Sequence, residues 1–224
     1  MKTNQEYKNA ALAALKGNWA PSVIATIVLM AFTYLIIGPY VVMYMLNLNG
    51  MTPGSPGLNL GVYALYIFGF TFVFSPLNIG YTYAFNSLYM EGDNAVTGNT
   101  FRFGFRRWGR NVWGMFLVGF FTSLWSLLLI VPGIIKFYAY AMTPYILIDN
   151  PELSANQAIN LSCKMMKGHK FDLFFLQLSF IGWGILSVFT GGIGLLWLMP
   201  YMMGAQVAFY QDIKQNFSQT NINN

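Results

Sequence analysis

The sequence predicts an all-α, polytopic membrane protein with about six transmembrane helices, and three observations carry this prediction. First, 56% of the 224 residues are hydrophobic and only 8% are charged, whereas soluble domains carry about 25% charged residues. Second, no charged residue occurs between Lys16 and Glu91, a stretch far longer than the roughly 20 apolar residues that cross a bilayer once. Third, the connections between the apolar segments alternate between basic and uncharged.

Six apolar segments follow one another along the chain and pair into three helical hairpins. They are Ala20–Leu46, Asn59–Met90, Val112–Val131, Ile134–Ile148, Phe171–Thr190 and Ile193–Tyr210. The first hydrophobic run is longer than the 7–15 residues of a signal-peptide core, so we interpret it as a retained span. We therefore expect one six-span membrane domain over residues 1–214, in which residues 1–19 form a cytoplasmic amphipathic helix. Residues 215–224 are expected to form a disordered cytoplasmic tail.

The distribution of lysine and arginine predicts the orientation of these segments. If all six cross the membrane, eleven of the twelve basic residues fall on the side of both termini, which the positive-inside rule makes cytoplasmic. The exception is Lys136, whose long stem would reach the headgroups from a predicted outer turn. The short fourth segment also fits a re-entrant loop, with five spans in total. That alternative places Lys164, Lys167 and Lys170 outside, so the charge bias favours six spans.

An internal repeat accompanies the three hairpins, because each is preceded by an amphipathic segment and a basic, glycine-containing stretch. The second helices of hairpins one and three share four residue types at identical spacing: Pro76, Gly80, Ala84 and Phe85, and Pro200, Gly204, Ala208 and Phe209. The middle hairpin keeps only Pro144. Glycine and alanine four residues apart let helix backbones approach closely. These pairs predict packing between the second and sixth helices, or a contact between copies of the chain.

The amphipathic segments are expected to be helices lying at the cytoplasmic interface, with the aromatic side toward lipid and the basic side among anionic headgroups. Two of them begin with capping-box patterns, Thr3 with Glu6 and Ser154 with Gln157, which start a helix by satisfying its free amides. The segment before the second hairpin carries four candidate headgroup contacts: Arg102, Arg106, Arg107 and Arg110. Each such residue contributes about 1 kcal/mol near an anionic leaflet. The alternative is that these segments only anchor the topology.

A polar stripe runs along the second predicted span. Asn78, Thr82 and Asn86 recur every four residues and therefore share one helix face. The repeat makes Gln206 on the sixth helix the counterpart of Thr82. Polar groups in hydrocarbon need partners, so this stripe should face the interior of the bundle. It fits either a path or pocket for a small neutral solute, or hydrogen bonds between helices that serve packing alone.

Enzymatic chemistry is not predicted. All seven acidic residues lie outside the predicted hydrocarbon core, and the single His169 lies at its edge. A metal site needs clustered His, Cys, Asp or Glu, and Cys163 is the only cysteine. We therefore expect no catalytic residues, no metal and no cofactor. Nucleic-acid binding is also not expected, since the basic residues lie in short loops beside the spans.

Several motifs together resemble a known family. They are LWSLLLIVPGIIK at 124–136, YAMTPYIL at 140–147, DNPELSA at 149–155, LKGNW at 15–19 and KMMKGHK at 164–170. This set is similar to the bacterial membrane family called domain of unknown function 975, over nearly the whole chain. The resemblance implies a protein of the bacterial cytoplasmic membrane, and the charge bias predicts that both of its termini lie in the cytoplasm. It implies no activity and no functional residues.

Two hypotheses of function follow. The first is a non-enzymatic membrane module that binds anionic lipid, a protein partner or a second copy, through the arginines and the small-residue helix faces. The alternative is a small permease, or the membrane subunit of a transporter, that uses the Asn78–Asn86 stripe and Gln206 to bind a small solute.

Overall fold

The computed structural model describes residues 1–49 and 56–222, and the regular structure within these ranges is helical throughout. Five helical stretches are long and apolar enough to cross a membrane: Trp19–Leu48, Asn59–Glu91, Trp108–Leu128, Ile130–Asp149 and Lys170–Phe189. These stretches overlap the first five predicted segments, although the predicted third and fifth segments end three residues and one residue later, at Val131 and Thr190. The sixth, Ile193–Tyr210, lies in a helix outside this set.

The helices form three repeats, each made of a short amphipathic helix followed by the outgoing and the return helix of a hairpin. The first repeat is α1 (Asn4–Leu15), α2 (Trp19–Leu48) and a return helix of α3 (Pro56–Gly69), η1 (Phe70–Phe74) and α4 (Ser75–Glu91). The second is α5 (Val96–Arg106), α6 (Trp108–Leu128) and a return helix of α7 (Ile130–Tyr140) and α8 (Thr143–Asp149). The third is α9 (Ala155–Met165), α10 (Lys170–Leu178), α11 (Ile181–Phe189) and the return helix α12 (Leu195–Ile222). Both expected capping boxes are present, at Thr3 and Ser154.

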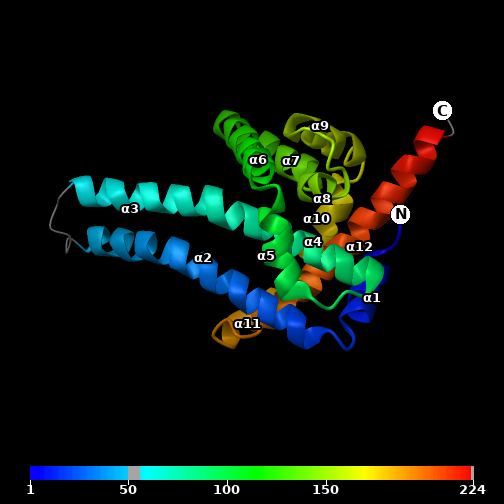
Figure 1. Ribbon diagram of the computed structural model, residues 1–224, viewed down its shortest axis with the longest axis horizontal. Helices are drawn as coiled ribbons and strands as arrows, with labels where there is room; N and C mark the ends of the chain where they lie inside the picture. The colour runs from blue at the N-terminus through cyan, green and yellow to red at the C-terminus, as the bar shows by residue number, and fades with distance from the viewer. Residues whose placement is uncertain (50–55, 223–224) are drawn as a thin grey trace.

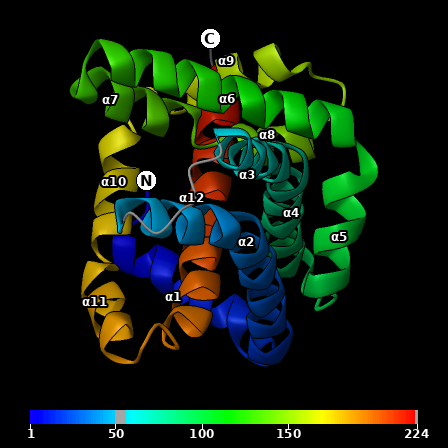
Figure 2. The same cartoon turned by 90° about the vertical axis from the view of Figure 1, so that its left-hand side faces the viewer.

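The three hairpins leave the centre of the molecule in different directions. In Figure 1, α2 and α3 project side by side to the left. In the turned view of Figure 2, α6 and α7 run across the top, α10 and α11 run down one side, and α12 passes through the middle. The outer parts of the hairpins expose many large apolar side chains. An exposed apolar surface of this extent is typical of contact with lipid or with another protein.

Each amphipathic helix packs against the return helix of a hairpin, so the repeats form a closed ring. Helix α5 packs on α4, α9 packs on α8, and α1 joins the two ends of the chain by packing on α12. On α1, Tyr7, Ala11 and Leu15 are at most 1% exposed, and the Tyr7 hydroxyl donates to Asp212 Oδ2 at 2.6 Å. The apolar face of α1 therefore lies against protein, where the sequence interpretation had turned such faces toward lipid. Amphipathic periodicity shows that a face is covered, but it does not show what covers it.

The glycines of the small-residue pairs make the contacts with the amphipathic helices. A Cβ on Gly80 would lie 1.8 Å from the carbonyl oxygen of Thr100 in α5, and a Cβ on Gly204 would lie 3.0 Å from the Cβ of Ala11 in α1. The alanines of the two pairs are also buried: Ala84 and Ala208. Helices α4 and α12 do pack on each other, as expected. The closest approaches at the two glycines, however, belong to α5 and α1.

The return helix of the second hairpin is broken between α7 and α8. Pro144 has no N–H and disfavours helical geometry in the residue before it, so the hydrogen-bond ladder is interrupted there. The hydroxyl of Ser162 on α9 bridges the break. It accepts from the Met142 N–H at 3.2 Å and donates to the Ala139 carbonyl at 2.8 Å. Within this apolar bundle, α9 thus supplies polar partners to two backbone groups at the break.

The return helix of the first hairpin contains a π-helical turn, η1, directly before Pro76. The carbonyl of Phe72 lies four residues before this proline, which has no N–H to offer it. The indole Nε1 of Trp108 donates to that carbonyl at 2.9 Å. This bond fixes the start of α6 against the first hairpin.

Helix α12 is the central helix, and it packs against α1, α2 and α4. Helix α12 is less apolar than the five stretches named above, because it contains Gln206, Gln211 and Asp212. A helix surrounded by other helices does not need an apolar surface on every side. The helix continues past Lys214 to Ile222, so most of the expected disordered tail is helical. The side chain of Phe217, which packs on the core, explains this extension. Residues 223–224 lie outside the described ranges.

Candidate functional site

The structure brings three of the four residues of the predicted polar stripe to one cavity. Asn78 and Thr82 of α4 and Gln206 of α12 line a cavity of about 270 Å³ between the return helices of the three hairpins. The second hairpin contributes Tyr145 of α8, and α12 also contributes three methionines: Met199, Met202 and Met203. Asn86 does not line this cavity. We call this space the central cavity.

Several polar groups of the central cavity have few or no partners. The hydroxyl of Thr82 donates to the backbone carbonyl of Asn78 at 2.9 Å. The carboxamides of Asn78 and Gln206 make no hydrogen bond within the described part of the chain. Tyr145 is 3% exposed, and its hydroxyl reaches only the Sδ of Met203, at 3.8 Å. A thioether is a weak acceptor, and buried tyrosine hydroxyls usually find a good one. These groups are available to a polar ligand.

The chemistry of this cavity suits an uncharged ligand. None of its lining residues in the described ranges is charged, so a bound ion would lose its hydration without gaining a counter-charge. The two carboxamides each offer a donor and an acceptor, while Leu29, Pro144 and the methionines offer apolar surface. Such a combination of a few convergent polar groups on an apolar wall is typical of small-molecule sites.

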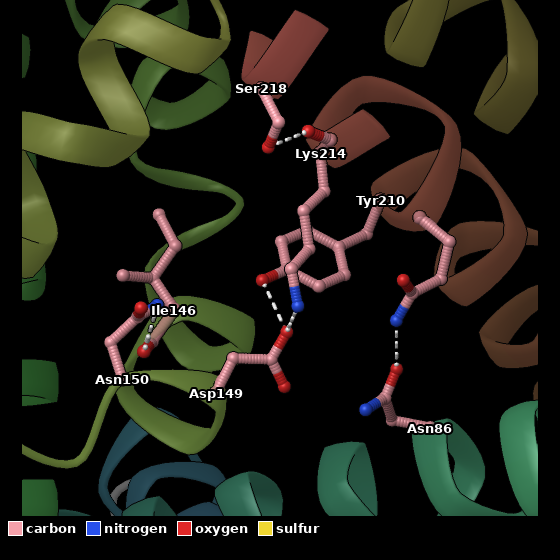
Figure 3. A network of polar contacts seen from close by, with 8 residues as sticks. Asn86, Ile146, Asp149, Asn150, Tyr210, Lys214 and Ser218 are labelled. Atoms are coloured by element: carbon pink, nitrogen blue, oxygen red, sulfur yellow. Dashed lines mark hydrogen bonds and ion pairs between the residues drawn. The ribbon is translucent and has the colours of Figure 1, made fainter. Parts of the chain in front are cut away.

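A layer of polar contacts lies further along the same three helices (Figure 3). Gln211 of α12 donates from Nε2 to Asn86 Oδ1 of α4 at 2.7 Å. The carboxylate of Asp149, at the end of α8, accepts from the Tyr210 hydroxyl at 2.8 Å and from Lys214 Nζ at 2.6 Å. Helix α12 thus contacts the other two return helices through side-chain hydrogen bonds. We call these five residues the polar layer.

The sequence interpretation found only Asn86 of this layer. Asp149 belongs to a family motif, and Lys214 is one of the eleven basic residues on the side of the termini; neither was predicted to take part in a site. A signal was present, because Tyr210 and Lys214 are four residues apart and therefore share a face of α12. The sequence does not show that Asp149 is the acceptor for these two side chains, because only the fold brings the end of α8 next to α12.

Two of the four predicted headgroup arginines are engaged inside the protein. Arg107 donates to the carbonyl of Pro151, and Arg110 donates to four carbonyls at and after the end of α8: Leu147, Asn150, Pro151 and Leu153. The last carbonyls of a helix have no partner within it, and they carry partial negative charge that attracts a cation. Arg110 therefore caps α8, and the expectation that it contacts lipid headgroups does not agree with these bonds.

Arg102 and Arg106 are exposed on α5, as a headgroup contact requires. Their guanidinium carbons lie 5.7 and 5.8 Å from the ring centre of Phe103, which stacks on Tyr83. Arg106 also lines a cavity of about 230 Å³ together with Arg107 and Arg110. This basic cavity lies where α5 meets the start of α6.

The remaining titratable groups are dispersed. Within the described ranges, no three His, Cys, Asp or Glu side chains lie close enough to hold a metal ion. His169 pairs through Nδ1 with Asp172 Oδ2 at 3.0 Å, one turn away on the surface. Burial raises the pKa of the Cys163 thiol, although Lys136 and Lys170 act in the opposite direction.

Comparison with known proteins agrees with the family resemblance. Residues 109–217, just under half of the chain, match a family described as "Protein of unknown function (DUF975)". The matched range covers the second and third hairpins and includes the VPGIIK and NPELS motifs. No match was found among curated proteins or among solved structures. The description of the family names no activity, so any function has to be argued from the site.

Proposed function

Starting from the match of residues 109–217 to this family, we propose that the protein is a non-enzymatic, six-span protein of the bacterial cytoplasmic membrane that acts as a small permease. Its central cavity binds a small uncharged solute. The observation that carries the proposal is the convergence of Asn78, Thr82 and Gln206 on one cavity, beside the weakly partnered hydroxyl of Tyr145.

The six-span arrangement adds α12 to the five apolar stretches. Support comes from its central position, because a helix enclosed by α1, α2 and α4 can cross a membrane with polar residues on its inner faces. The charge bias supports the same topology, with both termini in the cytoplasm. The cavity then lies among three return helices that each cross the membrane, as binding sites of transporters built from repeats do.

The structure also changes the balance between the two functions that the sequence left open. The lipid or partner module relied on free arginines and on free small-residue faces. Arg110 caps α8, and Gly80 and Gly204 pack against α5 and α1. The permease relied on a polar stripe that faces the interior, and that stripe lines a cavity.

The test is solute flux through the purified protein in liposomes. Glycerol and urea are suitable probes, since both are small, uncharged and rich in hydrogen-bonding groups. We expect Asn78→Leu and Gln206→Leu to abolish the protein-dependent flux, because each removes a donor and an acceptor from the cavity. Asn160→Leu is the matched control, since this carboxamide is exposed on α9. Equal flux in all variants, or no flux above empty liposomes, would contradict the proposal.

A second candidate function, binding of anionic lipid, is favoured by the basic cavity beside α5. Arg106 lines it and is exposed, so a phosphate is the natural ligand of this guanidinium. Titration with phosphatidylglycerol and native mass spectrometry would test it. Arg102→Gln with Arg106→Gln should reduce the number of lipids retained, whereas Lys167→Gln, at an exposed lysine elsewhere, should not. Equal retention by all variants would leave this candidate without support.

A further inference from the structure

We propose that the polar layer is a gate between the central cavity and a second cavity on the cytoplasmic side. This inference rests on the proposed function, because it names the route by which a solute reaches the central cavity. The second cavity, of about 260 Å³, is lined mainly by polar residues that include Ser87, Glu91, Asp149 and Lys214. We call it the vestibule.

The two cavities follow one another along the same three helices. On α4, Asn78 and Thr82 line the central cavity, and Asn86 lines the vestibule four to eight residues later. On α12, Gln206 lines the first and Lys214 the second. The same order holds on α8, where Tyr145 precedes Asp149 by four residues, which is about one turn. The return helices of all three repeats therefore line both spaces in sequence.

Four residues of the polar layer, all except Tyr210, line the vestibule, and in our proposal the contacts of the layer close the way from the vestibule to the central cavity. Its contacts join α12 to α4 through Gln211 and Asn86, and join α12 to α8 through Tyr210 and Asp149. The ring of Tyr210 also stacks on Tyr145 with centroids 4.7 Å apart. Tyr145 lines the central cavity, so this stack connects the layer directly to the proposed solute site.

The chemistry of the layer suits a closure that opens. Apolar packing at such a position is often as stable as a buried ion pair, or more stable. Each hydrogen bond between side chains contributes little net free energy, because water or a polar solute can replace the lost partner. Lys214 is also part-exposed, with 45% of its side chain accessible. It can leave Asp149 for solvent without losing its hydration. All of these contacts involve α12, so a small displacement of that helix would break them together.

The first experiment measures access to the central cavity and does not depend on transport. The background is Cys163→Ser, since Cys163 is the only cysteine, with Thr82→Cys as a reporter in the cavity. A charged methanethiosulfonate reagent is applied from the cytoplasmic side. Asp149→Asn weakens the layer while leaving an acceptor for Tyr210, and we expect it to raise the modification rate at least tenfold. Asp172→Asn, at an exposed acid outside the layer, should leave the rate unchanged.

The second experiment locks the layer. Asn86→Cys with Gln211→Cys is joined by a reducible bifunctional thiol reagent, and glycerol flux is measured before and after reduction. We expect flux to fall at least tenfold when locked and to recover on reduction. A matched pair, Gln5→Cys with Asn9→Cys, places two thiols on the exposed side of α1, where these side chains are 2.9 Å apart. Locking that pair should not change flux.

The outcomes separate the gate from the permease. Faster modification in Asp149→Asn without any glycerol flux would overturn the proposed function and support the gate. Glycerol flux that is insensitive to the lock, with an unchanged modification rate, would overturn the gate and leave the permease standing. If neither flux nor access responds, both are overturned. Circular dichroism and gel filtration of each variant establish that the change is not a loss of folding.

Discussion

The bridge that Ser162 makes across the break between α7 and α8 gives a sharp prediction. The substitution Ser162→Ala removes one oxygen atom, and two backbone groups lose their partner: the N–H of Met142 and the carbonyl of Ala139. Both residues are buried, at 0% and 3% exposed, and Ser162 itself is fully buried. A buried polar group without a partner costs about 1–3 kcal/mol. Two such groups would together cost more than one, but a small shift of the backbone can give one of them a new partner. The variant should therefore be less stable by about 2–4 kcal/mol.

The assay is thermal unfolding of the purified protein in detergent, followed by tryptophan fluorescence. For a chain of this size, each kcal/mol corresponds to about 2–4 °C in Tm. Ser187→Ala is the matched control, because its hydroxyl is also buried but donates within its own helix to the carbonyl of Trp183 at 2.8 Å. That carbonyl also has the helix ladder, so the control should cost under about 1 kcal/mol. Equal losses in Tm for the two variants would refute the reasoning that the bridge stabilises the break.

Three further predictions concern packing, pH and topology. Gly80→Ala places a Cβ 1.8 Å from a backbone oxygen of α5 and should lower stability by about 1–3 kcal/mol in the same assay; Gly119→Ala, whose Cβ meets no atom within 4 Å, should not. Burial acts to raise the pKa of Asp212, but hydrogen bonds from Tyr7 and a backbone N–H outweigh it and lower that pKa. At a pH near this pKa the native state therefore binds fewer protons than the unfolded chain. The α1–α12 contact is strongest above about pH 4 and weakens as the pH falls below it. Hydrogen exchange of α1 should accelerate below this pH, and Asp212→Asn should remove the pH dependence. Six spans place Cys163 in the cytoplasm, so an impermeant maleimide should label it only in opened spheroplasts. Because burial raises its pKa, the labelling should be slow at pH 7 and faster at higher pH.

Much of the architecture follows from local signals that the sequence carries openly. Hydrophobic length predicts the apolar stretches, and the capping boxes at Thr3 and Ser154 predict where α1 and α9 begin. The spacing shared by Gly80 and Gly204 predicts close helix contacts at both positions; such contacts are present, but with α5 and α1 and not between the second and sixth predicted helices. Each of these signals depends on neighbours along the chain, which is why the sequence alone is sufficient to read it.

The parts that were missed depend on partners far away in the sequence. The partners of Arg110 are backbone carbonyls, which every residue has and which no residue type reveals. The partner of Asn86 is Gln211, whereas the four-residue spacing groups Asn86 with Asn78 and Thr82, which line the cavity. Asn86 lies outside the cavity for a physical reason. Helix α12 carries Gln211 where the cavity ends, and the carboxamide of Gln211 can donate a hydrogen bond to the carboxamide of Asn86. The periodicity of α4 predicts on which face of the helix Asn86 lies. Only the fold shows how far along the bundle Asn86 lies, and therefore which cavity it lines.

The contact between α1 and α12 also constrains how the protein is made. Helix α1 is synthesised long before its partner α12. Until α12 is complete, Tyr7, Ala11 and Leu15 have no surface of this protein to cover them, and the ring of repeats stays open. A nascent chain that stops early therefore displays an apolar amphipathic helix, which is the kind of segment that chaperones and membrane proteases recognise. Docking of α1 therefore waits for the synthesis of α12, and it distinguishes a chain that contains this helix from one that stops before it.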